Sequence, residues 1–598
     1  MKRNRLKLLL IIFACVTLIL GLTACKDEEN SSSSSASSSQ QGSTKPEVFT
    51  YTDKTITGLT DYGQTLQQLI IPDGFTAIGE EAFRSYSSLE SIIIPYGVTS
   101  IGESAFFDCA SLESIIIPNS VTSIGQFAFR GCSSLKSITL PDGFTAIDEE
   151  MFKNCNSLLS VIIPDSVTTI GRSAFSGCNS LLSVSIPDSV TTIGTDAFSN
   201  CASIESITIP DGVTAINNYT FANCNNLTDI TISQSVTSIG DWAFANCDSL
   251  ESITLPESVT SIGDWAFNNC DGLTDVTIPE SVTSINESAF RDCSSLKSIT
   301  IKSIASIGQY AFDNCNNLTS INLPNGVKSI GNSAFKDCDS LTSITIKSIL
   351  FIGQYAFANC DNLTSITIES ITSIGEFAFA KCNSLTSITL PNSVTTIGAS
   401  AFMDCDSLTS ITIPDSVTAI GESAFFSCNS LTSITIPSGV TSIGAYTFEA
   451  CTSLTTITIP VSVTTIGESA FYGCTSLTNI TIDKNNVSFQ SIDGNLYSKD
   501  GTTLIQYAIG KTQTNFTVPD GVTIINNYAF ENCDSLESIT IPVSVKAIGS
   551  SAFAGCANLQ DIEFTGTINQ WNAIFKVSGW NKDVPATKVV CLDGEVTL

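Results

Sequence analysis

The sequence predicts a repeat solenoid, a stack of similar coils that share one continuous core. Two observations support this fold class. First, a unit of 23 residues recurs along the chain; a clear copy runs over residues 385–405, and the next starts at Leu408. Second, nineteen of the 22 cysteines mark the units, from Cys109 to Cys556. Repeats of roughly 20–50 residues are typical of solenoids, because one unit alone cannot bury its own apolar side chains.

The first 24 residues predict a signal peptide of the lipoprotein type. Basic residues at the start precede an apolar run from Leu8 to Leu22, which is short for a membrane-spanning helix of about 20 residues. Leu22-Thr23-Ala24-Cys25 resembles the lipobox of bacterial lipoproteins, which implies a lipid on Cys25 and a membrane as partner. The alternative is an uncleaved anchor helix followed by a chance cysteine.

Residues 25–47 are Ser-rich and lack the apolar groups needed for a core, so we expect a flexible tether. A coil of about 20 residues spans roughly 25 Å. The stretch Lys26 to Glu29 resembles the surface-export signal of some bacterial lipoproteins. We therefore expect a protein of the bacterial cell envelope that is lipid-anchored and surface-exposed.

Each repeat has four recognisable parts. Leu-x-x-Ile-x-Ile predicts a strand, and proline follows it in 16 of 20 copies. Next comes a slot that holds Gly in 16 copies and Asn or Asp in the others, which predicts a left-handed backbone there. Ala-Phe-x-x-Cys-x-x-Leu has helical spacing and predicts a short helical turn. Copies 1–18 occupy residues 66–482, and copies 19 and 20 occupy residues 519–562.

This order of strand, proline, Gly, Ala-Phe and Cys resembles the leucine-rich repeats of BspA-like bacterial surface lipoproteins. The resemblance implies a solenoid of the leucine-rich-repeat type, capped at both ends. It further implies parallel β-strands on the concave face and short helical turns on the convex side.

Three segments interrupt the repeat. Residues 48–65 predict an N-terminal cap with a small hairpin. Residues 483–518 are an insertion, in which the stretch from Leu496 to Ile505 predicts a hairpin with a turn at Asp500-Gly501. Residues 563–598 predict a C-terminal cap, because open solenoid ends expose apolar edges.

The repeated cysteines have two interpretations. Twenty-two cysteines suggest disulfides or metal, but nineteen share one slot, and Tyr86 fills it in the first copy. Disulfides need partners in pairs, and a metal site needs ligands that converge from different directions. We therefore expect a buried column of free thiols, with no metal and no cofactor.

Acidic residues follow the strand in several successive copies. A row of carboxylates is a possible Ca²⁺ site, but Asp is also a common turn residue, and Asn119 or Asn392 serves in the same slot. We favour the turn interpretation. The row comprises Asp142, Asp165, Asp188, Asp211, Glu257 and Glu280.

Aromatic side chains form a second row, two residues after the glycine slot. Such a row is a candidate platform for glycan or protein. The alternative is sideways packing between neighbouring coils. The strand positions between, such as Ser387 and Thr389, predict a neutral, hydroxyl-rich sheet without a pocket or a basic cluster. The candidate binding residues are Tyr219, Trp242, Trp265, Tyr310 and Tyr355.

Composition limits the function. A net charge of −31 repels phosphate backbones, so we expect no nucleic-acid partner. The absence of histidine removes Ser-His and Cys-His nucleophile pairs. We expect a non-enzymatic surface lipoprotein that binds extracellular proteins or glycans of a host or a neighbouring cell. This adhesive role rests on analogy with the BspA-like proteins. The alternative is a structural spacer or envelope component without a specific ligand.

Overall fold

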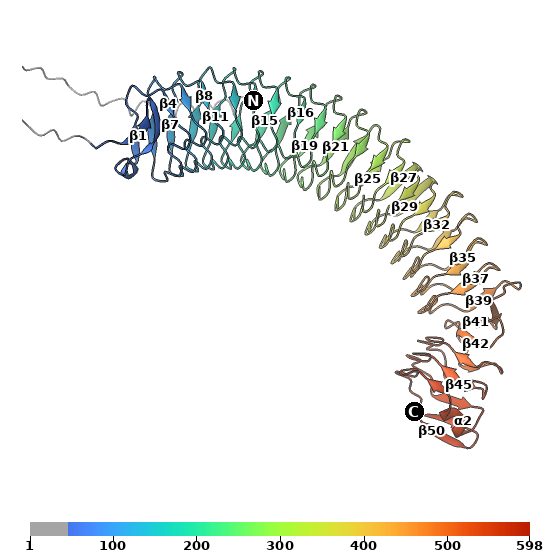
Figure 1. Cartoon of the computed structure of the whole chain (residues 1–598). Coiled ribbons are helices and arrows are strands. Elements are labelled where there is room, and N and C mark those ends of the chain that lie inside the picture. The colour runs from blue at the N-terminus through green and yellow to red at the C-terminus, as the bar shows by residue number, and fades with distance from the viewer. Residues whose placement is uncertain (1–45) are drawn as a thin grey trace, which may run out of the picture. The chain divides into compact units, whose positions relative to one another are not determined.

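A computed structural model describes residues 46–598. Residues 48–598 form one unit, in which similar coils follow one another in chain order (Figure 1). Each regular coil contains two short strands. In the coil that begins near Leu385 these are β31 (Ser387–Thr389) and β32 (Thr396–Ile397). The predicted solenoid is confirmed.

The first strands of the coils pair in parallel with those of their neighbours. The pairing keeps register, so that Ser387 lies opposite Ser410 and Ile388 opposite Ile411. Equivalent positions of successive repeats therefore stack in columns. These strands are β3 (Gln68–Ile70), β5 (Ser91–Ile93), β7 (Ser114–Ile116), β9 (Ser137–Thr139), β11 (Ser160–Ile162), β13 (Ser183–Val184), β15 (Ser206–Thr208), β17 (Asp229–Thr231), β19 (Ser252–Thr254), β21 (Asp275–Ile278), β23 (Ser298–Ile301), β25 (Ser320–Asn322), β27 (Ser343–Ser348), β29 (Ser365–Ser370), β31, β33 (Ser410–Thr412), β35 (Ser433–Thr435), β37 (Thr456–Ile459), β39 (Asn479–Ile482), β43 (Asn515–Thr517), β45 (Ser538–Ile541) and β47 (Asp561–Phe564).

The second strands form a further set of parallel ladders, each only two residues wide. The third strand residue of a coil faces out, while the isoleucine that ends each second strand faces the core, with Ile466 partly exposed. They are β4 (Ala77–Ile78), β6 (Ser100–Ile101), β8 (Ser123–Ile124), β10 (Ala146–Ile147), β12 (Thr169–Ile170), β14 (Thr192–Ile193), β16 (Ala215–Ile216), β18 (Ser238–Ile239), β20 (Ser261–Ile262), β22 (Ser284–Ile285), β24 (Ser306–Ile307), β26 (Ser329–Ile330), β28 (Phe351–Ile352), β30 (Ser373–Ile374), β32, β34 (Ala419–Ile420), β36 (Ser442–Ile443), β38 (Thr465–Ile466), β44 (Ile524–Ile525) and β46 (Ala547–Ile548).

The segment expected to be a short helical turn is not helical. Its alternate N–H groups donate to the next coil instead of along their own: Ser400 N to Glu422 O (2.8 Å), Phe402 N to Ala424 O (2.9 Å) and Asp404 N to Phe426 O (2.8 Å). We call this set of bonds the turn ladder. An α-helix would direct these donors within the segment. Within residues 46–598 the helices are η1 (Gly63–Thr65) and α2 (Ile568–Asn572).

The prediction of a left-handed glycine slot was also wrong. In the coil of Gly398 the left-handed residues are Ser400 (φ 53°) and Asp404 (φ 56°), two and six positions later. The glycine is required for a different reason: a Cβ at Gly398 would lie 2.6 Å from the carbonyl carbon of Gly375 in the preceding coil. Glycine is therefore favoured in this slot because the backbones of two successive coils approach each other closely there.

The core consists of columns of identical side chains. The phenylalanine rings stack from coil to coil, for example Phe402 on Phe425 with centroids 5.5 Å apart and planes 3° apart. All nineteen repeat cysteines are buried and free, which confirms the thiol column. In eighteen of them Sγ lies 3.0–3.3 Å from the phenylalanine carbonyl of the preceding coil, so the thiol also acts as a donor.

The segments that break the repeat close the ends and interrupt the middle. At the N-terminal end β1 (Phe49–Thr52) and β2 (Thr55–Leu59) form the expected hairpin, and β2 pairs with β4. In the insertion β40 (Phe489–Ile492), β41 (Asn495–Ser498) and β42 (Thr503–Gln506) are antiparallel neighbours, with Gly501 in the turn between the last two. The C-terminal segment contributes α2, β48 (Phe575–Lys576), β49 (Lys588–Cys591) and β50 (Gly594–Thr597).

The insertion also divides the core. One apolar cluster extends from the N-terminal cap to Leu496, and a second begins at Tyr497 and ends in the C-terminal segment, where Trp571 and Trp580 are buried. Phe471 is the last ring of the long phenylalanine stack. A new stack begins where Tyr507 lies on Phe530.

Candidate functional site

The aromatic row occupies the left-handed position of the coils, two residues after the glycine slot. Tyr219, Trp242 and Trp265 have φ of 57–59°. Tyr219 stacks on Trp242 with centroids 6.0 Å apart, and Trp242 stacks on Trp265 at 4.7 Å with planes 2° apart. Both faces of the Trp242 ring are therefore covered by neighbours. The stack presents ring edges to solvent, which supports sideways packing over a platform that offers open ring faces.

A cation extends this stack by one more coil. The coil after Trp265 has Ser288 at the aromatic position, and the guanidinium of Arg291 fills the space beside it. Its central carbon lies 5.4 Å from the Trp265 ring centre and 5.5 Å from that of Tyr310. A guanidinium between two ring faces gains roughly 0.5–2 kcal/mol per contact, more as water is excluded. Four of the five candidate residues thus belong to one continuous stack.

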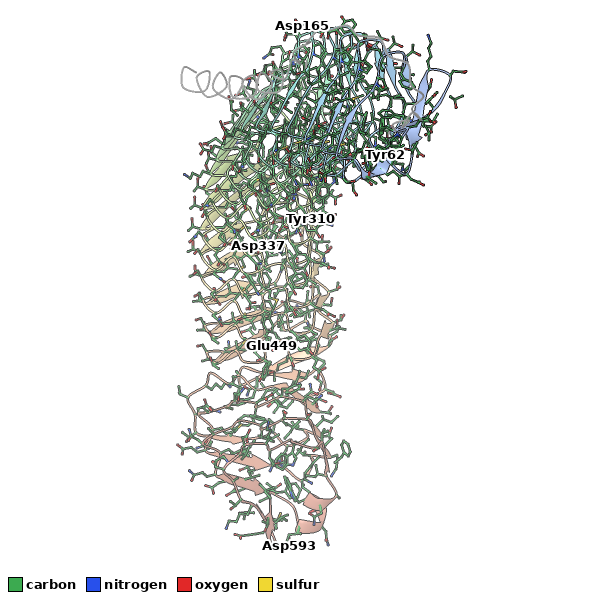
Figure 2. The ribbon with its side chains drawn as sticks, turned by 90° about the vertical axis from the view of Figure 1, so that its left-hand side faces the viewer. Tyr62, Asp165, Tyr310, Asp337, Glu449 and Asp593 are labelled. Atoms are coloured by element: carbon green, nitrogen blue, oxygen red, sulfur yellow. The ribbon has the colours of Figure 1, made fainter. Side chains whose placement is uncertain are left out.

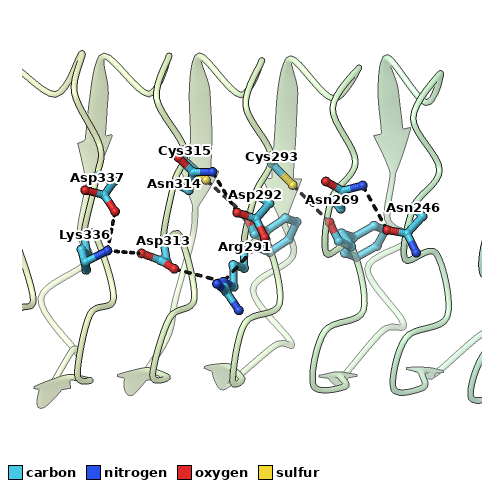
Figure 3. Close-up of polar contacts among 12 residues, drawn as sticks. Asn246, Asn269, Arg291, Asp292, Cys293, Asp313, Asn314, Cys315, Lys336 and Asp337 are labelled. Atoms are coloured by element: carbon cyan, nitrogen blue, oxygen red, sulfur yellow. Dashed lines mark hydrogen bonds and ion pairs between the residues drawn. The ribbon is translucent and has the colours of Figure 1, made fainter.

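A buried carboxylate, that of Asp313, holds Arg291 in place (Figure 3). Arg291 Nε lies 3.0 Å from Asp313 Oδ2, and Lys336 Nζ lies 3.8 Å from Asp313 Oδ1. Burial raises the pKa of the Asp313 carboxyl, while the charges of Lys336 and Arg291 act in the opposite direction. The same view shows a feature that sequence reasoning missed: Asn269 Nδ2 donates to Asn246 Oδ1 at 3.0 Å, one step of an amide ladder.

Tyr355 belongs to a separate group. It stacks on Phe377 with centroids 4.7 Å apart. The coil of Ser333 lies between Tyr355 and Tyr310, and no ring contact joins these two tyrosines in the part of the chain that the structure describes. Figure 2 labels Tyr310 and, in the neighbouring coil, Asp337. The row is therefore two short stacks rather than one platform.

The sheet formed by the first strands is less uniform than its predicted hydroxyl pattern. In the N-terminal coils isoleucine replaces the outward-facing threonine. Ile70, Ile93, Ile116 and Ile162 are 69%, 50%, 57% and 59% exposed. The first three are direct neighbours across parallel strands. We call these four residues the isoleucine column; its visible signal in the sequence was Ile in place of Thr as the last strand residue, in Gln-Leu-Ile, Ser-Ile-Ile (twice) and Ser-Val-Ile.

The acidic row makes turn and inter-coil contacts. Asn119 Nδ2 donates to Asp142 Oδ2 at 3.0 Å, Ser233 Oγ donates to Asp211 Oδ1 at 2.6 Å, and Glu257 pairs with Lys302. Asp165 lies at the surface (Figure 2). Within residues 46–598 no three His, Cys, Asp or Glu side chains are grouped so as to hold a metal ion. These contacts agree with the turn interpretation.

The expected lipidation site, Cys25, lies outside the described residues, as do the signal segment and nearly all of the tether. Among residues 46–598 there is no helix with the length and apolarity needed to cross a bilayer. The lipid anchor thus stays a prediction from the sequence.

Comparison with known proteins agrees with the coil geometry. The chain matches the family described as "BspA type Leucine rich repeat region (6 copies)" over residues 61–182, 145–274, 286–408, 372–503 and 502–578. No protein among the curated sequences matches it.

Solved structures of bacterial repeat proteins are similar to the chain. A leucine-rich repeat protein from Bacteroides ovatus is 24% identical, with 92% of this chain and 99% of that one covered and a TM-score of 0.29. A leucine rich cell surface protein from Faecalibacterium prausnitzii is 28% identical, with 75% and 96% covered and a TM-score of 0.26. Since the family match spans most of the coils described above, this chain belongs to the BspA-type leucine-rich repeat family.

Proposed function

We propose that the protein is a non-enzymatic lipoprotein of the bacterial cell surface, held in the membrane by a lipid on Cys25, and that its solenoid binds proteins or glycans of a host or of neighbouring cells. The isoleucine column is the observation that carries the binding role. Isolated apolar side chains are common on surfaces, but a contiguous apolar strip on a sheet, here Ile70, Ile93 and Ile116, is typical of an interaction site.

The column lies in a neutral, hydroxyl-bearing setting. Ile93 is flanked along its strand by Ser91, and in the coil of β9 Thr139 takes the isoleucine position beside Ile162. An apolar line between rows of hydroxyls offers a partner both apolar burial and hydrogen bonds. Full burial of an isoleucine side chain contributes about 1.5–3 kcal/mol, and these residues are roughly half exposed, so each contributes about 1 kcal/mol on binding.

An array of matrix proteins and glycans, probed with residues 47–598, tests the proposal. We expect a saturable ligand whose affinity falls roughly 30-fold in the double variant Ile93→Thr, Ile116→Thr, because about 2 kcal/mol of burial is lost. Threonine is the residue that other coils place there, so the fold should persist. The control is Val487→Thr, which removes an apolar group that is 70% exposed elsewhere on the chain.

The array also separates this proposal from the structural alternative. A protein that serves only as a spacer has no preferred ligand, and its solenoid would bind no array spot above background. The continuous ring stack and the thiol column would then serve rigidity alone. A ligand that binds the double variant and the parent chain equally would exclude the isoleucine column as the binding surface.

A further inference from the structure

The insertion leaves one coil of the solenoid incomplete. In a regular coil twelve residues, 398–409, separate the second strand β32 from the next first strand β33. In the insertion coil only eight residues, 507–514, separate β42 from β43. Tyr507 follows β42 directly and takes the place of the repeat phenylalanine: its N–H donates to Ala529 O at 2.9 Å, and its ring stacks on Phe530 at 4.8 Å.

The missing part can therefore be identified. In the regular coil four residues, Gly398 to Ala401, lie between β32 and Phe402. In the insertion coil Leu504 is the counterpart of Ile397, because it pairs with Ile525 and its carbonyl accepts from Asn526 N at 3.0 Å. Only Ile505 and Gln506 lie between Leu504 and Tyr507, so this coil is two residues short. The two flanking coils, with Gly467–Ala470 on one side and Asn526–Ala529 on the other, thus have a shortened segment between them in place of the full four residues.

This gap leaves turn-ladder groups unpaired. One coil earlier, Tyr446 N donates to Glu468 O at 3.0 Å and Phe448 N donates to Ala470 O at 2.9 Å. The equivalent donors, Ser469 N and Phe471 N, have no hydrogen-bond partner among the described residues, and neither does the acceptor Asn527 O. Phe471 is only 2% exposed, so an unpaired N–H there carries a desolvation cost of about 1–3 kcal/mol.

A cavity occupies the place of the missing residues. It has a volume of about 320 Å³, and we call it the notch. Its walls include Glu468 and Ser469 on one side and Asn527 on the other, above Leu496 and Gln506. Ile466 also lines it and is partly exposed, whereas the equivalent Ile443 is 2% exposed. The volume is at the lower end of that of small-ligand pockets, roughly 300–1,000 Å³.

The same edge of the solenoid accepts a non-repeat segment elsewhere. At the C-terminal end Phe553 N donates to Trp580 O at 2.8 Å, and Gly555 N donates to Lys582 O at 2.9 Å. Those two acceptors belong to the cap and not to a repeat. The turn ladder can therefore be completed by polypeptide of unrelated sequence.

We propose that the notch binds a short extended segment of a partner polypeptide. The second and fourth residues of that segment accept hydrogen bonds from Ser469 N and Phe471 N, and its third residue donates to Asn527 O. This pattern of two carbonyls and one N–H is the one that Ala399, Ala401 and Ser400 supply in a complete coil. It adds a strand-like segment by main-chain bonds, as in strand addition at sheet edges.

The walls also select the side chains of the segment. A Cβ at Gly467 would lie 2.3 Å from Ala445 N, so backbones in this row approach closely and the first residue of the segment is glycine. The fourth is alanine or serine, because Ala470 in the equivalent place is buried. Glu468 lines the notch, and the oxygens Glu449 Oε2 and Glu531 Oε2 nearby are buried without partners. Flanking lysine or arginine on the segment therefore favours binding.

This inference deepens the proposed function, on which it rests for the class of partner. The probe is a fluorescein-labelled peptide Lys-Gly-Ala-Ser-Ala-Lys, whose core copies residues 398–401. We expect saturable binding to residues 47–598 by fluorescence anisotropy. Hydrogen exchange of the stretch 467–474 should slow on binding. The same peptide with an N-methylated serine lacks the donor to Asn527 O and should bind at least tenfold more weakly.

A filled variant supplies the matched comparison. Replacing Ile505-Gln506 by Gly-Ala-Ser-Ala gives the short coil the regular four residues between Leu504 and Tyr507 and should abolish peptide binding. Inserting two residues, Ala-Ser, between Asp500 and Gly501 in the exposed hairpin turn adds the same length and should leave binding unchanged. Equal affinity of these two variants for the peptide, or unaltered exchange over 467–474, would overturn the proposal.

The outcome is separable from that of the proposed function. If the parent protein binds ligands on the array but does not bind the peptide, the surface-binding proposal stands and the proposal for the notch is wrong. If the peptide binds as described while the array stays silent, the notch stands and the proposed surface ligand is wrong.

Discussion

The glycine slot offers the sharpest test of how the coils are held together. In the variant Gly331→Ala the new Cβ would lie 2.6 Å from Gln309 N and 2.6 Å from the carbonyl carbon of Gly308. Ordinary contacts begin near 3.4 Å, so the two coils must separate by several tenths of an ångström. Gly331 N donates to Ile307 O at 2.9 Å across that contact, and the separation lengthens this bond. Overpacking of this kind costs about 1–3 kcal/mol.

Two matched substitutions make the result diagnostic. Gly143→Ala places a Cβ where no atom lies within 4 Å and where φ is not positive, so it should be neutral or stabilising by about 0.4–1 kcal/mol. Gly331→Asn should cost less than Gly331→Ala, because Asn217 in this slot donates Nδ2 to Ile193 O at 2.6 Å. The added bond offsets part of the strain.

Local hydrogen exchange is the suitable measurement, because long repeat arrays do not unfold in one cooperative step. We expect faster exchange over residues 307–335 in Gly331→Ala and no change there in Gly143→Ala. If Gly331→Ala exchanges like the parent chain, the close-approach explanation is refuted. The isolated contact then does not limit coil spacing, and the glycine pattern needs another cause.

Four further predictions concern the thiols, the cation stack and the anchor. Burial raises the pKa of Cys405 to about 12, so its thiol and those of the column should resist maleimide at pH 8; labelling of native protein at the column would contradict the burial. In the unfolded chain the thiols lose their protons above the ordinary thiol pKa of 9.0, whereas in the folded chain they keep them. The free energy of unfolding should therefore be constant below pH 9 and fall above it, by about 1.4 kcal/mol per pH unit for each thiol in a cooperative unit. An unfolding midpoint that does not change between about pH 8 and 10.5 would refute this. Arg291→Met should destabilise its coils by roughly 1–3 kcal/mol, since it leaves Asp313 buried with a weaker partner, and should change the fluorescence of Trp265; Arg172→Met, at an exposed ion pair, is the control, and equal effects would argue against the stack. Cys25→Ala should release the protein from the membrane fraction into the soluble one, and retention in the detergent phase of a Triton X-114 partition would rule out the lipid anchor.

The features that recur in every copy of the repeat could be predicted from the sequence. Twenty copies average out local noise, so the period and the burial of the column from Cys109 to Cys556 were accessible from spacing, whereas the parallel strands were implied by the resemblance to BspA-like repeats. Sequence reasoning failed where the same residue type satisfies two physical demands. Glycine serves both left-handed backbone and close approach, and only coordinates distinguish Gly398 from Ser400, where the left-handed turn lies. Helical spacing likewise matched a segment whose N–H groups, such as that of Phe402, point to the next coil.

The candidate site was predictable in its members but not in its geometry. Tyr219, Trp242 and Trp265 were visible as a row, yet only the interplanar angles show that their faces are mutually covered. Arg291 could not be found from the sequence, because its role depends on the small Ser288 leaving space between Trp265 and Tyr310. The residues of the isoleucine column were present in the sequence but were interpreted only as part of the strand pattern, since Ile and Thr both favour strands.

The notch shows why an interruption of a repeat is a stronger candidate for recognition than the repeat itself. In a regular coil every main-chain group of the turn ladder is matched by an identical neighbour, so the surface offers a partner only side chains, and each outward row is nearly constant. A coil two residues short reverses this: Ser469 N, Phe471 N and Asn527 O are left in a defined spacing that no neighbouring coil satisfies. Main-chain groups at fixed spacing recognise polypeptide by geometry, while the walls restrict which residues enter. Selection for a rigid array would remove such a defect, because it leaves a buried donor unpaired and divides the core into two clusters. Its presence beside an ordered hairpin therefore argues for a bound segment, and filling the coil is the change that decides between the two.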